Sequence, residues 1–458
     1  MHGWLAAGPR QGVLHGSSIL SAGRKISADG TRSVVVVEGL RTPFVKAGGA
    51  LSGVHASELG RVPMEELLIR RGVAAAELDE VIFGNVAQPA DSANIARVVA
   101  LRAGVPVSTP ASTVHRNCAS GMEAITTAFD RIRFGCSDLV LAGGIESMSG
   151  IPFLYSRRAR DKFIRLGRSR SLPGKLAALA SFRPGDFKPV IGIEKGLTDP
   201  FCGLNMGDTA ENLAREFAIS RRDQDEFALQ SHQRACIARA AGILAQEIVP
   251  LHAGPKFEAV CEDVGPRKGQ SIEALQKLRP YFDRTLGTVT VGNACPITDG
   301  GVALLLASEE KAAELGLQPL GRIVSYAYRG CSPARMGLGP AYSTPLALER
   351  AGSSLKDMDR IELNEAFAAQ VLANRAAFES RAFAEAELGL SEPIGELSSD
   401  RLNVNGGAIA LGHPVGASGA RIVLTLLKDL QRRGLGRGLA SLCVGGGQGG
   451  ALVVETVE

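Results

Sequence analysis

At 458 residues the chain is too long for one ordinary compact core, so we expect two or three domains, or one duplicated domain that carries an insertion. Hydrophobic residues make up 45% and charged residues 21%, as in globular enzymes, and a net charge of +4 is too small to indicate a nucleic-acid-binding protein. No apolar run is long enough to cross a bilayer as a helix, and the eight cysteines show neither a C-x-x-C pair nor metal-ligand spacing, so the sequence predicts no membrane span, no metal site and a reducing compartment.

Residues 1–32 are predicted to form a flexible N-terminal extension. They are polar, and Arg10, Arg24, Lys25 and Arg32 outweigh a single acid, Asp29. A disordered tail of a cytoplasmic protein has such a composition, and so does a transit peptide that directs a protein to the mitochondrial matrix. Both interpretations stay open at this point.

The folded chain is expected to begin at Ser33, because the β-branched run 34–37 predicts a strand buried on both faces. Further strands are predicted at 80–83, 139–143, 302–306, 360–363, 440–444 and 451–455, with helices between them, one starting near Cys118 and one near Ala417. The sequence of 139–144 resembles that of 442–447, each after a helix. We therefore interpret the chain as a duplicated α/β unit.

The stretch between residues 150 and 286 breaks this alternation, with loops, a basic segment and one strong helix at 221–241. It predicts an inserted lid domain at 151–286. The N-terminal core then comprises 33–150 and 287–312, and the C-terminal core comprises 313–458. Within the insertion, the segment 157–175, from Arg157 to Lys175, holds eight Arg or Lys and one acid, Asp161.

Four motifs could carry chemistry. In N-C-A-S-G at 117–121, Cys118 lies between a predicted strand and the start of a helix, where the helix dipole favours a thiolate nucleophile, although such a cysteine can also be an inert core residue. In the glycine-rich stretch 403–419, His413 could accept a proton from a thiol, or it could be incidental to a phosphate-binding turn.

The other two motifs lie in the last hundred residues. C-V-G-G-G-Q-G-G at 443–450 would expose the Cys443 thiol and several backbone N–H groups, which suits an acid/base beside an oxyanion hole; a nucleotide-binding turn is disfavoured because no G-x-G-x-x-G is followed there by a helix and a distant acid. N-E-A-F-A at 364–368 could place an amide and a ring beside a ligand, or could simply begin a helix capped by Asn364.

Together these motifs resemble the signature set of the thiolase family. The resemblance also includes R-T-P-F at 41–44, A-G-G-I-E-S-M at 142–148, M-G-D-T-A-E at 206–211, G-T-V-T at 287–290 and Asn293, so it extends from Ser33 to the C-terminus. It implies the thiolase fold, an α/β fold with a duplicated core, layered helices and two five-stranded mixed sheets, plus an inserted loop domain.

The resemblance also implies roles for single residues. Cys118 would be the nucleophile, His413 its base and Cys443 the second acid/base. His413 and a water held by Asn364 would stabilise the enolate oxygen, and the backbone N–H groups of Cys118 and Gly445 would stabilise the tetrahedral adduct.

A CoA thioester would enter beneath the inserted domain, past three residues predicted to line the channel, Met206, Phe367 and Ser418. CoA would be a substrate, with no cofactor and no metal, and relatives suggest a homodimer or homotetramer.

Three departures concern specificity and partners. Short-chain thiolases have a histidine where this sequence has Asn205, and Cys295 occupies a position usually held by serine or threonine. The segment 157–175 is similar to the extended loop of thiolase subunits of fatty-acid oxidation complexes, which contacts a membrane or a partner subunit; a solvated loop that attracts CoA phosphates is the alternative.

The function implied is cleavage of 3-oxoacyl-CoA to acetyl-CoA and a shortened acyl-CoA, as in fatty-acid β-oxidation. A biosynthetic acetyl-CoA acetyltransferase, which condenses two acetyl-CoA, is the first alternative. A condensing ketoacyl synthase would have a second histidine where Cys443 stands. A noncatalytic lipid-binding relative would be expected to lose one of the catalytic groups, and this sequence keeps Cys118, Asn364, His413 and Cys443.

Overall fold

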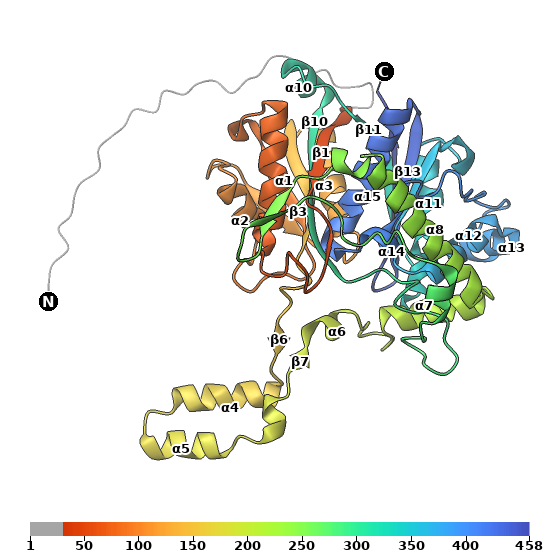
Figure 1. Ribbon diagram of the computed structural model, residues 1–458. Coiled ribbons are helices and arrows are strands. Elements are labelled where there is room, and N and C mark those ends of the chain that lie inside the picture. Colours follow the sequence, from red (N-terminus) through yellow and green to blue (C-terminus); the bar gives the residue numbers. More distant parts are fainter. Residues whose placement is uncertain (1–30, 458) are drawn as a thin grey trace, which may run out of the picture.

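The computed structural model describes residues 31–457, in which a central mixed sheet is covered by helices on both faces (Figure 1). The strands are β1 (Val34–Arg41), β2 (Val45–Lys46), β3 (Glu80–Gly84), β4 (Ala111–Val114), β5 (Leu139–Glu146), β6 (Phe153–Leu154), β7 (Val190–Ile191), β8 (Leu251–Ala253), β9 (Glu258–Val260), β10 (Thr298–Ser308), β11 (Gly321–Gly330), β12 (Arg360–Leu363), β13 (Arg437–Val444) and β14 (Gln448–Glu455).

Helices alternate with the core strands. They are α1 (Ala56–Arg71), α2 (Ile95–Arg102), α3 (Ser120–Arg133), α4 (Arg157–Arg168), α5 (Leu172–Ala180), α6 (Gly192–Gly196), α7 (Met206–Glu216), α8 (Arg221–Ala240), α9 (Ile272–Gln276), α10 (Glu309–Glu314), α11 (Gly339–Arg350), α12 (Ala368–Glu379), α13 (Arg381–Phe383), α14 (Ala408–Leu411) and α15 (Val415–Arg433). The last of these begins two residues before the helix start predicted near Ala417.

The two halves of the sheet have the same topology. In the N-terminal half the order is β4-β3-β5-β10-β1, and in the C-terminal half it is β12-β13-β14-β11. The parallel pairs β3–β5 and β12–β13 correspond, as do the antiparallel pairs β10–β1 and β14–β11. A single parallel bridge between Ile361 and Leu402 stands where β4 pairs with β3 in the other half. The duplicated α/β core predicted from the sequence is therefore confirmed.

The sheet differs from the prediction in one respect, because its strands form one ten-stranded sheet instead of two five-stranded sheets. The halves are joined where β1 and β11 pair at Val35–Arg322 and Val36–Gly321. On its other side β11 lies close to β14 at the same residue, since an added Cβ on Gly321 would lie 2.5 Å from the Glu455 carbonyl oxygen. In the C-terminal half the strand expected at the edge is reduced to the bridge at Leu402.

Helices α3 and α15 lie side by side against both halves of the sheet, and they share one large apolar core with it. The apolar side chains of Met122, Ile125, Phe129 and Ile132 on α3 are buried there. On the opposite face, α1 and α2 cover the N-terminal half, and α11 and α12 cover the C-terminal half. The sheet therefore has α3 and α15 on one face and these four helices on the other (Figure 1).

The first turns of α3 and α15 cross at glycines. An added Cβ on Gly121 would lie 2.8 Å from the Ala420 nitrogen and 2.9 Å from the Gly416 oxygen, and one on Gly419 would lie 2.6 Å from the Met122 nitrogen. All three distances are shorter than side chains tolerate, so glycine is required at these contacts. The crossing brings together the two chain segments that precede these helices, which contain Cys118 and His413.

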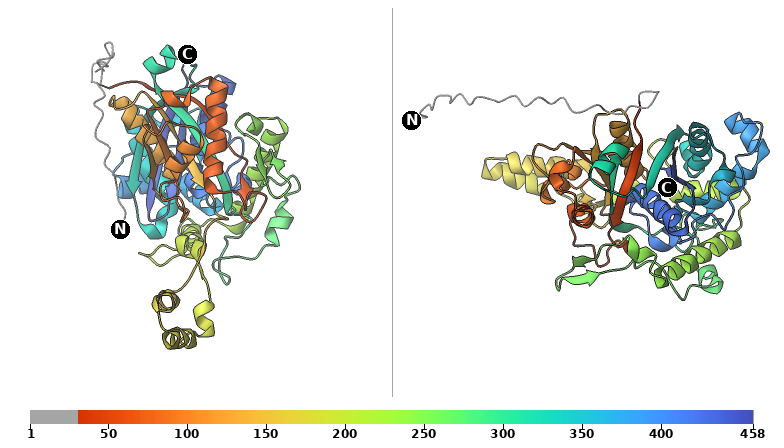
Figure 2. Two further views of the ribbon diagram at one scale, coloured as in Figure 1. Left: turned by 90° about the vertical axis from the view of Figure 1, so that its left-hand side faces the viewer. Right: turned by 90° about the horizontal axis from the view of Figure 1, so that it is seen from above.

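The stretch predicted as an insertion folds in two parts. Residues 153–191, which we call the arm, form a helical hairpin of α4 and α5 that projects from the core on the β6–β7 ribbon (Figures 1 and 2). The remainder returns to the core, where α7 packs against α12 and α8 packs against α14.

Residues 1–30, which make up most of the predicted extension, lie outside the described residues. At the end of this extension, Arg32 is buried and forms ion pairs with Asp138 and Glu310, so this residue is part of the folded core. Within residues 31–457, no helix combines the length and apolarity that crossing a bilayer requires.

Candidate active site

Cys118 lies between the end of β4 and the start of α3, in a sharp turn. The preceding residue, Asn117, has φ of 42°, a left-handed conformation that non-glycine residues adopt rarely. Its side-chain amide donates a hydrogen bond to the Gly445 carbonyl oxygen at 2.7 Å. This contact fixes the Cys118 turn against the loop that follows β13.

The surroundings of the Cys118 sulfur keep it protonated. Burial raises the pKa of the thiol, and the negative charge of Glu146 raises it further, whereas the backbone N–H groups of Gly445 and of Cys118 lower it because they point at the sulfur. Cys118 therefore needs a base before it can attack a substrate. The same two N–H groups are the pair predicted to form an oxyanion hole.

His413 lies in the loop before α15 with its ring orientation fixed by Ser418. The Ser418 hydroxyl donates to the Pro414 carbonyl oxygen at 3.0 Å and lies 2.6 Å from Nδ1 of His413. Because the hydroxyl has one proton, Nδ1 is the protonated nitrogen and Nε2 has the free lone pair. Nε2 is buried and has no hydrogen-bond partner among the described residues, and burial, with the charge of Arg421, lowers the pKa of His413 to about 4. The ring is a neutral base at physiological pH.

Cys443 lies near the end of β13 and is buried in a small apolar cluster with Ala294, Ala366 and Phe367. Burial raises the pKa of its thiol well above the usual value, and the neighbouring thiols of Cys118, Cys295 and Cys331 raise it further. A group that holds its proton so firmly can donate it to a carbanion or enolate.

Asn364 follows β12 and is completely buried. Neither its amide nitrogen nor its amide oxygen has a hydrogen-bond partner among the described residues. Because buried polar groups are almost always paired, this side chain requires a water molecule or a ligand atom beside it. The finding is compatible with the predicted water at this position.

The segment 294–297 connects these motifs. Ala294 forms a bridge with Phe367, the Cys295 N–H donates to the Ala366 carbonyl oxygen at 3.0 Å, and Ile297 forms a bridge with His413. Burial raises the pKa of Cys295 to about 12, with a further contribution from the nearby Cys118 thiol. The four motifs therefore surround one region of the core, and Cys295 is a third thiol in it.

Met206 and Phe367 form one wall of this region. Both pack in the same cluster as Cys443, where Phe282 contacts Phe367 edge to face with ring centroids 6.0 Å apart. Gly445 faces this wall, since an added Cβ would lie 3.4 Å from the Met206 sulfur. Ser418, also predicted to line the CoA channel, is buried, with its hydroxyl beside the His413 ring.

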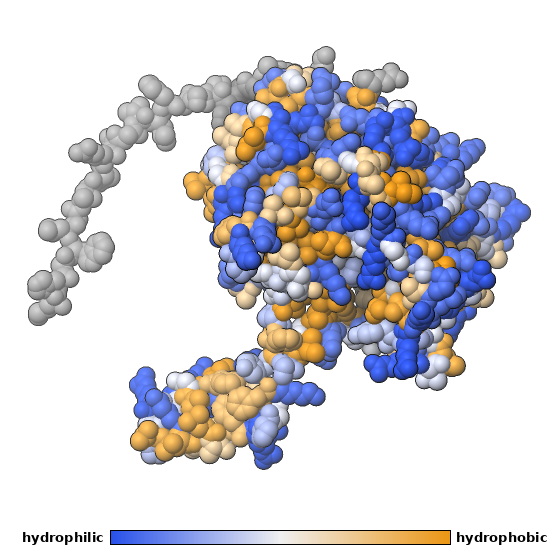
Figure 3. Space-filling model, in the orientation of Figure 1, coloured by the Kyte–Doolittle hydropathy of each residue, from blue (hydrophilic) through white to orange (hydrophobic). Residues whose placement is uncertain are grey.

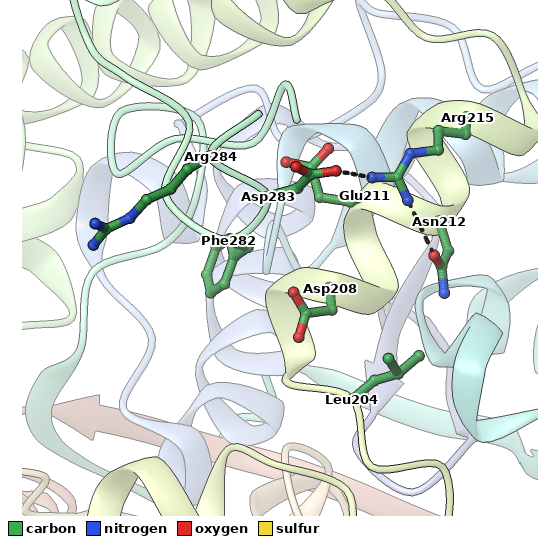
Figure 4. Close-up of a pocket in the computed structure, with 8 residues that line it drawn as sticks. All are labelled: Leu204, Asp208, Glu211, Asn212, Arg215, Phe282, Asp283 and Arg284. Carbon is green, nitrogen blue, oxygen red and sulfur yellow. Dashed lines mark hydrogen bonds and ion pairs between the residues drawn. The ribbon is translucent and has the colours of Figure 1, made fainter. Parts of the chain in front are cut away.

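A hollow of about 550 Å³ opens on the outer side of the same wall (Figure 4). Its lining comprises Leu204, Asp208, Glu211, Asn212, Arg215, Phe282, Asp283 and Arg284. Arg215 forms an ion pair with Asp283. The remaining charged side chains of the lining are two acids, Asp208 and Glu211, and one base, Arg284, so the hollow is poorly suited to phosphate groups. None of the predicted site residues lines this hollow.

Two buried glutamates that the sequence analysis did not single out hold the His413 loop. Glu365 accepts hydrogen bonds from the Ser231 hydroxyl at 2.6 Å, the Asn403 amide at 2.9 Å and the Ile409 N–H at 3.2 Å. Glu146, at the end of β5, accepts one from the Gly416 N–H at 2.9 Å. Both residues lie inside motifs quoted above, but their spacing in the sequence gives no signal of which N–H groups they accept from.

Asn205, the first departure noted in the sequence, caps α7. Its side-chain oxygen accepts from the Gly207 N–H at 3.1 Å, and its own N–H donates to Asp208. The residue therefore fixes the start of the helix that carries Met206. Among residues 31–457, no three His, Cys, Asp or Glu side chains gather in a way that could hold a metal ion.

Comparisons with known proteins agree on one family. Residues 34–310 match the model of the thiolase N-terminal domain, and residues 317–456 match that of the thiolase C-terminal domain. The chain is 43% identical over 423 residues to the 3-ketoacyl-CoA thiolase of Yersinia enterocolitica. The aligned region covers 92% of this chain and 96% of that protein.

Solved structures agree with the sequence comparison. The acetyl-CoA acetyltransferase of Bacillus anthracis superposes with a TM-score of 0.82 at 40% identity, over 93% of this chain and 99% of that chain. Human mitochondrial 3-ketoacyl-CoA thiolase in complex with CoA superposes with a TM-score of 0.80 at 38% identity, over 93% and 98%.

Proposed function

The chain belongs to the thiolase family, and from this premise we propose that it is an acyltransferase that cleaves 3-oxoacyl-CoA with CoA into acetyl-CoA and a shortened acyl-CoA. The observation that carries the proposal is the crossing of α3 and α15, which brings the segments of Cys118 and His413 together. The Cys118 thiol is held protonated beside the N–H groups of Cys118 and Gly445, and the His413 ring is neutral. The 43% identity to a 3-ketoacyl-CoA thiolase supports this substrate class.

The first half of the reaction forms an acyl-enzyme. Nε2 of His413 takes the thiol proton of Cys118, and the thiolate attacks the 3-oxo carbon of the substrate. The N–H groups of Cys118 and Gly445 stabilise the oxyanion, and the bond between C2 and C3 then breaks to leave the acyl group on Cys118. Cys443 protonates the departing acetyl-CoA enolate, whose oxygen is stabilised by His413 and a water on Asn364.

The second half returns the enzyme to its starting state. The Cys443 thiolate takes the proton of the incoming CoA thiol, and the CoA thiolate attacks the acyl thioester. Cys118 leaves as a thiolate and recovers its proton from His413. Each proton that left a protein group is thus restored. CoA is a substrate, because it leaves as part of the shortened acyl-CoA, and the proposed steps use neither a cofactor nor a metal.

The channel assignment is part of the proposal. Met206 and Phe367 line the path of the pantetheine arm, because they form the wall beside Cys443. Ser418 acts on this path through His413, since its hydroxyl is turned toward that ring. This would give CoA an apolar wall on the side of α7.

The decisive experiment is a thiolysis assay across 3-oxoacyl-CoA chain lengths, with Cys118→Ala as the control. We expect turnover by the wild-type enzyme and an acyl adduct on Cys118 in mass spectra when CoA is limiting. Turnover by Cys118→Ala at the wild-type rate, or an adduct on another cysteine, would contradict the proposed nucleophile.

Condensation of two acetyl-CoA is the second candidate function, favoured by the 40% identity to an acetyl-CoA acetyltransferase. The same assay separates the two, because a biosynthetic enzyme would prefer acetoacetyl-CoA to longer substrates. A noncatalytic lipid-binding relative is disfavoured by the presence of all four groups, Cys118, Asn364, His413 and Cys443.

We further propose a homodimer, or a homotetramer built from dimers, in the cytoplasm. Strand β4 ends the sheet with an outer edge that no strand of residues 31–457 covers, and an uncovered edge is a ready surface for pairing with a second copy. The bacterial relatives support the cytoplasm. The mitochondrial matrix is the alternative location, because one relative is a human mitochondrial enzyme.

The arm is proposed to dock on an anionic membrane surface, with a partner subunit of a fatty-acid oxidation complex as the alternative. On α5, Leu172, Leu176 and Leu179 share one face and are 71%, 59% and 53% exposed. Figure 3 shows apolar side chains gathered on the arm with hydrophilic ones around them. Such an apolar face with a basic margin suits anionic lipid better than a purely solvated loop that attracts CoA phosphates.

A further inference from the structure

A buried carboxylate joins three segments that are distant in the chain. Glu146, the last residue of β5, is completely buried. Its Oε2 accepts hydrogen bonds from the backbone N–H groups of Gly416 at 2.9 Å and Val86 at 3.2 Å, and its Oε1 accepts from the Ala87 N–H at 3.0 Å and the Asn85 side chain at 3.1 Å. The end of β5, the turn after β3 and the first turn of α15 therefore share one anchor.

Helix α15 has no side-chain cap from its own sequence. Its N-cap residue is Pro414, whose side chain cannot accept a hydrogen bond. A carboxylate at this end of a helix satisfies free N–H groups and interacts favourably with the helix dipole. Glu146 supplies this cap from another strand, and it does so at close range, because an added Cβ on Gly416 would lie 2.6 Å from the Ile145 carbonyl oxygen.

The cap lies in the same helical turn as the group that orients the base. Gly416 lies two residues before Ser418, whose hydroxyl lies 2.6 Å from Nδ1 of His413. A shift of the first turn of α15 would move Ser418 and with it the imidazole ring. The position of His413 therefore depends on the contact between Glu146 and Gly416.

Glu146 also acts on the nucleophile through space. Its negative charge raises the pKa of the Cys118 thiol, in addition to the larger effect of burial. The other ionisable group facing Glu146 is Asp299 on β10, and burial together with Asp299 raises the pKa of Glu146 to about 7, against the N–H groups that lower it. Removal of the Glu146 charge would thus make Cys118 easier to ionise.

We propose that Glu146 is a positioning residue for acyl transfer, which holds the start of α15 so that His413 stays in register with Cys118. The kinetic part of this inference rests on the proposed function. Glu146 then has two separable effects. Its carboxylate holds the first turn of α15 in place, and its charge disfavours ionisation of the Cys118 thiol.

Two variants separate these effects. In Glu146→Gln an amide NH2 replaces one of the two carboxylate oxygens, and the two N–H donors that this oxygen accepted from lose their acceptor. We therefore expect kcat for thiolysis to fall about ten- to hundredfold with KM changed by less than about threefold. The pH profile of Cys118 alkylation by iodoacetamide should move to lower pH, because the charge is gone. Glu146→Asp keeps the charge but cannot reach Gly416, so kcat should fall while the alkylation profile stays that of the wild type.

The matched control is Glu38→Gln, which changes a glutamate that is paired with Lys428 near the other end of α15. We expect neither its kcat nor its alkylation profile to change. An unchanged kcat in both Glu146 variants overturns the proposal, and so does a lower kcat in Glu146→Gln with an unmoved alkylation profile, which indicates a purely structural role. If Glu146→Gln does not fold, wild-type kcat in Glu146→Asp overturns it.

The same experiment distinguishes failure of the function from failure of this inference. If the wild-type enzyme shows no thiolysis, the proposed function fails. The alkylation profiles of wild type and Glu146→Gln then still decide the coupling between Glu146 and Cys118, and identical profiles overturn it.

Discussion

The core and the arm use the same residue types in opposite ways. In α15 the leucines and even Arg421 are buried, and the arginine is paired with Glu362 at 2.8 Å. In α5 the leucines are exposed, and all five arginines of α4 are exposed as well. The core therefore buries its apolar surface, and this burial holds two reactive segments together. The arm leaves its apolar surface exposed, so that another partner can bind there. Stability and chemistry should depend on the core, and attachment on the arm.

The arm is nevertheless a folded unit. The Phe163 ring packs against Phe182 in a tilted arrangement and against Phe187 edge to face, with ring centroids 4.9 and 6.5 Å away. Lys162 forms an ion pair with the buried Asp186. This small aromatic core keeps the two helices together. It explains how the leucine face of α5 can stay exposed without the arm unfolding.

The strongest test of the comparison is His413→Asn. Loss of the base should lower kcat about 10²- to 10⁴-fold, because Cys118 holds its proton at neutral pH. The measurement is thiolysis of a soluble substrate, together with binding to anionic liposomes as the readout for the arm. Liposome binding should equal that of the wild type, and a parallel loss of both activities would refute the separation of core and arm.

A matched pair of leucines tests where stability resides. Leu430 in α15 is completely buried and Leu176 in α5 is 59% exposed. Leu430→Ala should lower the free energy of unfolding by about 2 to 5 kcal/mol, whereas Leu176→Ala should change it by less than about 0.5 kcal/mol. Urea denaturation followed by circular dichroism measures both. Equal losses would show that the exposed stripe is part of the folded core.

Acid should destabilise the core through its buried base. The pKa of His413 is lowered to about 4 in the folded chain. Between pH 6.5 and 4 this histidine therefore binds a proton in the unfolded chain but not in the folded chain. Stability is therefore complete above pH 6.5 and falls as the pH drops toward 4, by about 3 kcal/mol for this residue. Unfolding free energies at pH 7.5 and 5 measure the effect, and the slope should be smaller in His413→Asn. The arm has no histidine, so its liposome binding should not follow this slope.

The smallest effect is expected from the arm. Changing Arg157, Arg158, Arg160 and Arg165 together to Ser should weaken binding to anionic liposomes at least about tenfold and leave turnover of a soluble substrate within about twofold. The control replaces four exposed arginines of the core: Arg70, Arg222, Arg329 and Arg350. Liposome sedimentation provides the measurement. If both quadruple variants bind like the parent, the membrane role is excluded and a partner subunit becomes the better explanation.

The sequence was sufficient to predict the duplicated core, because its strands are short apolar runs separated by helices. Strands predicted at 80–83 and 360–363 lie within or match β3 and β12. It did not predict α4 and α5 as separate helices, since glycines and Pro173 interrupt the segment and its helices depend on Phe163 meeting Phe182 and Phe187. Contacts of that kind form only after the chain has turned back on itself.

The same limit applies to the site. The motifs located Cys118, His413, Cys443 and Asn364, because small residues around a reactive side chain leave a local pattern. The role of Glu146 has no such pattern, because it depends on the pairing of β5 with β3 and on where α15 crosses that edge of the sheet. Residues that act across strands are found only once the strands are placed.

The glycine crossing of α3 and α15 has a consequence for how such a protein can be divided. Cys118 and Glu146 come from one repeat, and Asn364, His413 and Cys443 come from the other. Cutting the polypeptide between the repeats, near residue 316, would therefore yield two fragments that each retain a recognisable motif and no complete reaction centre.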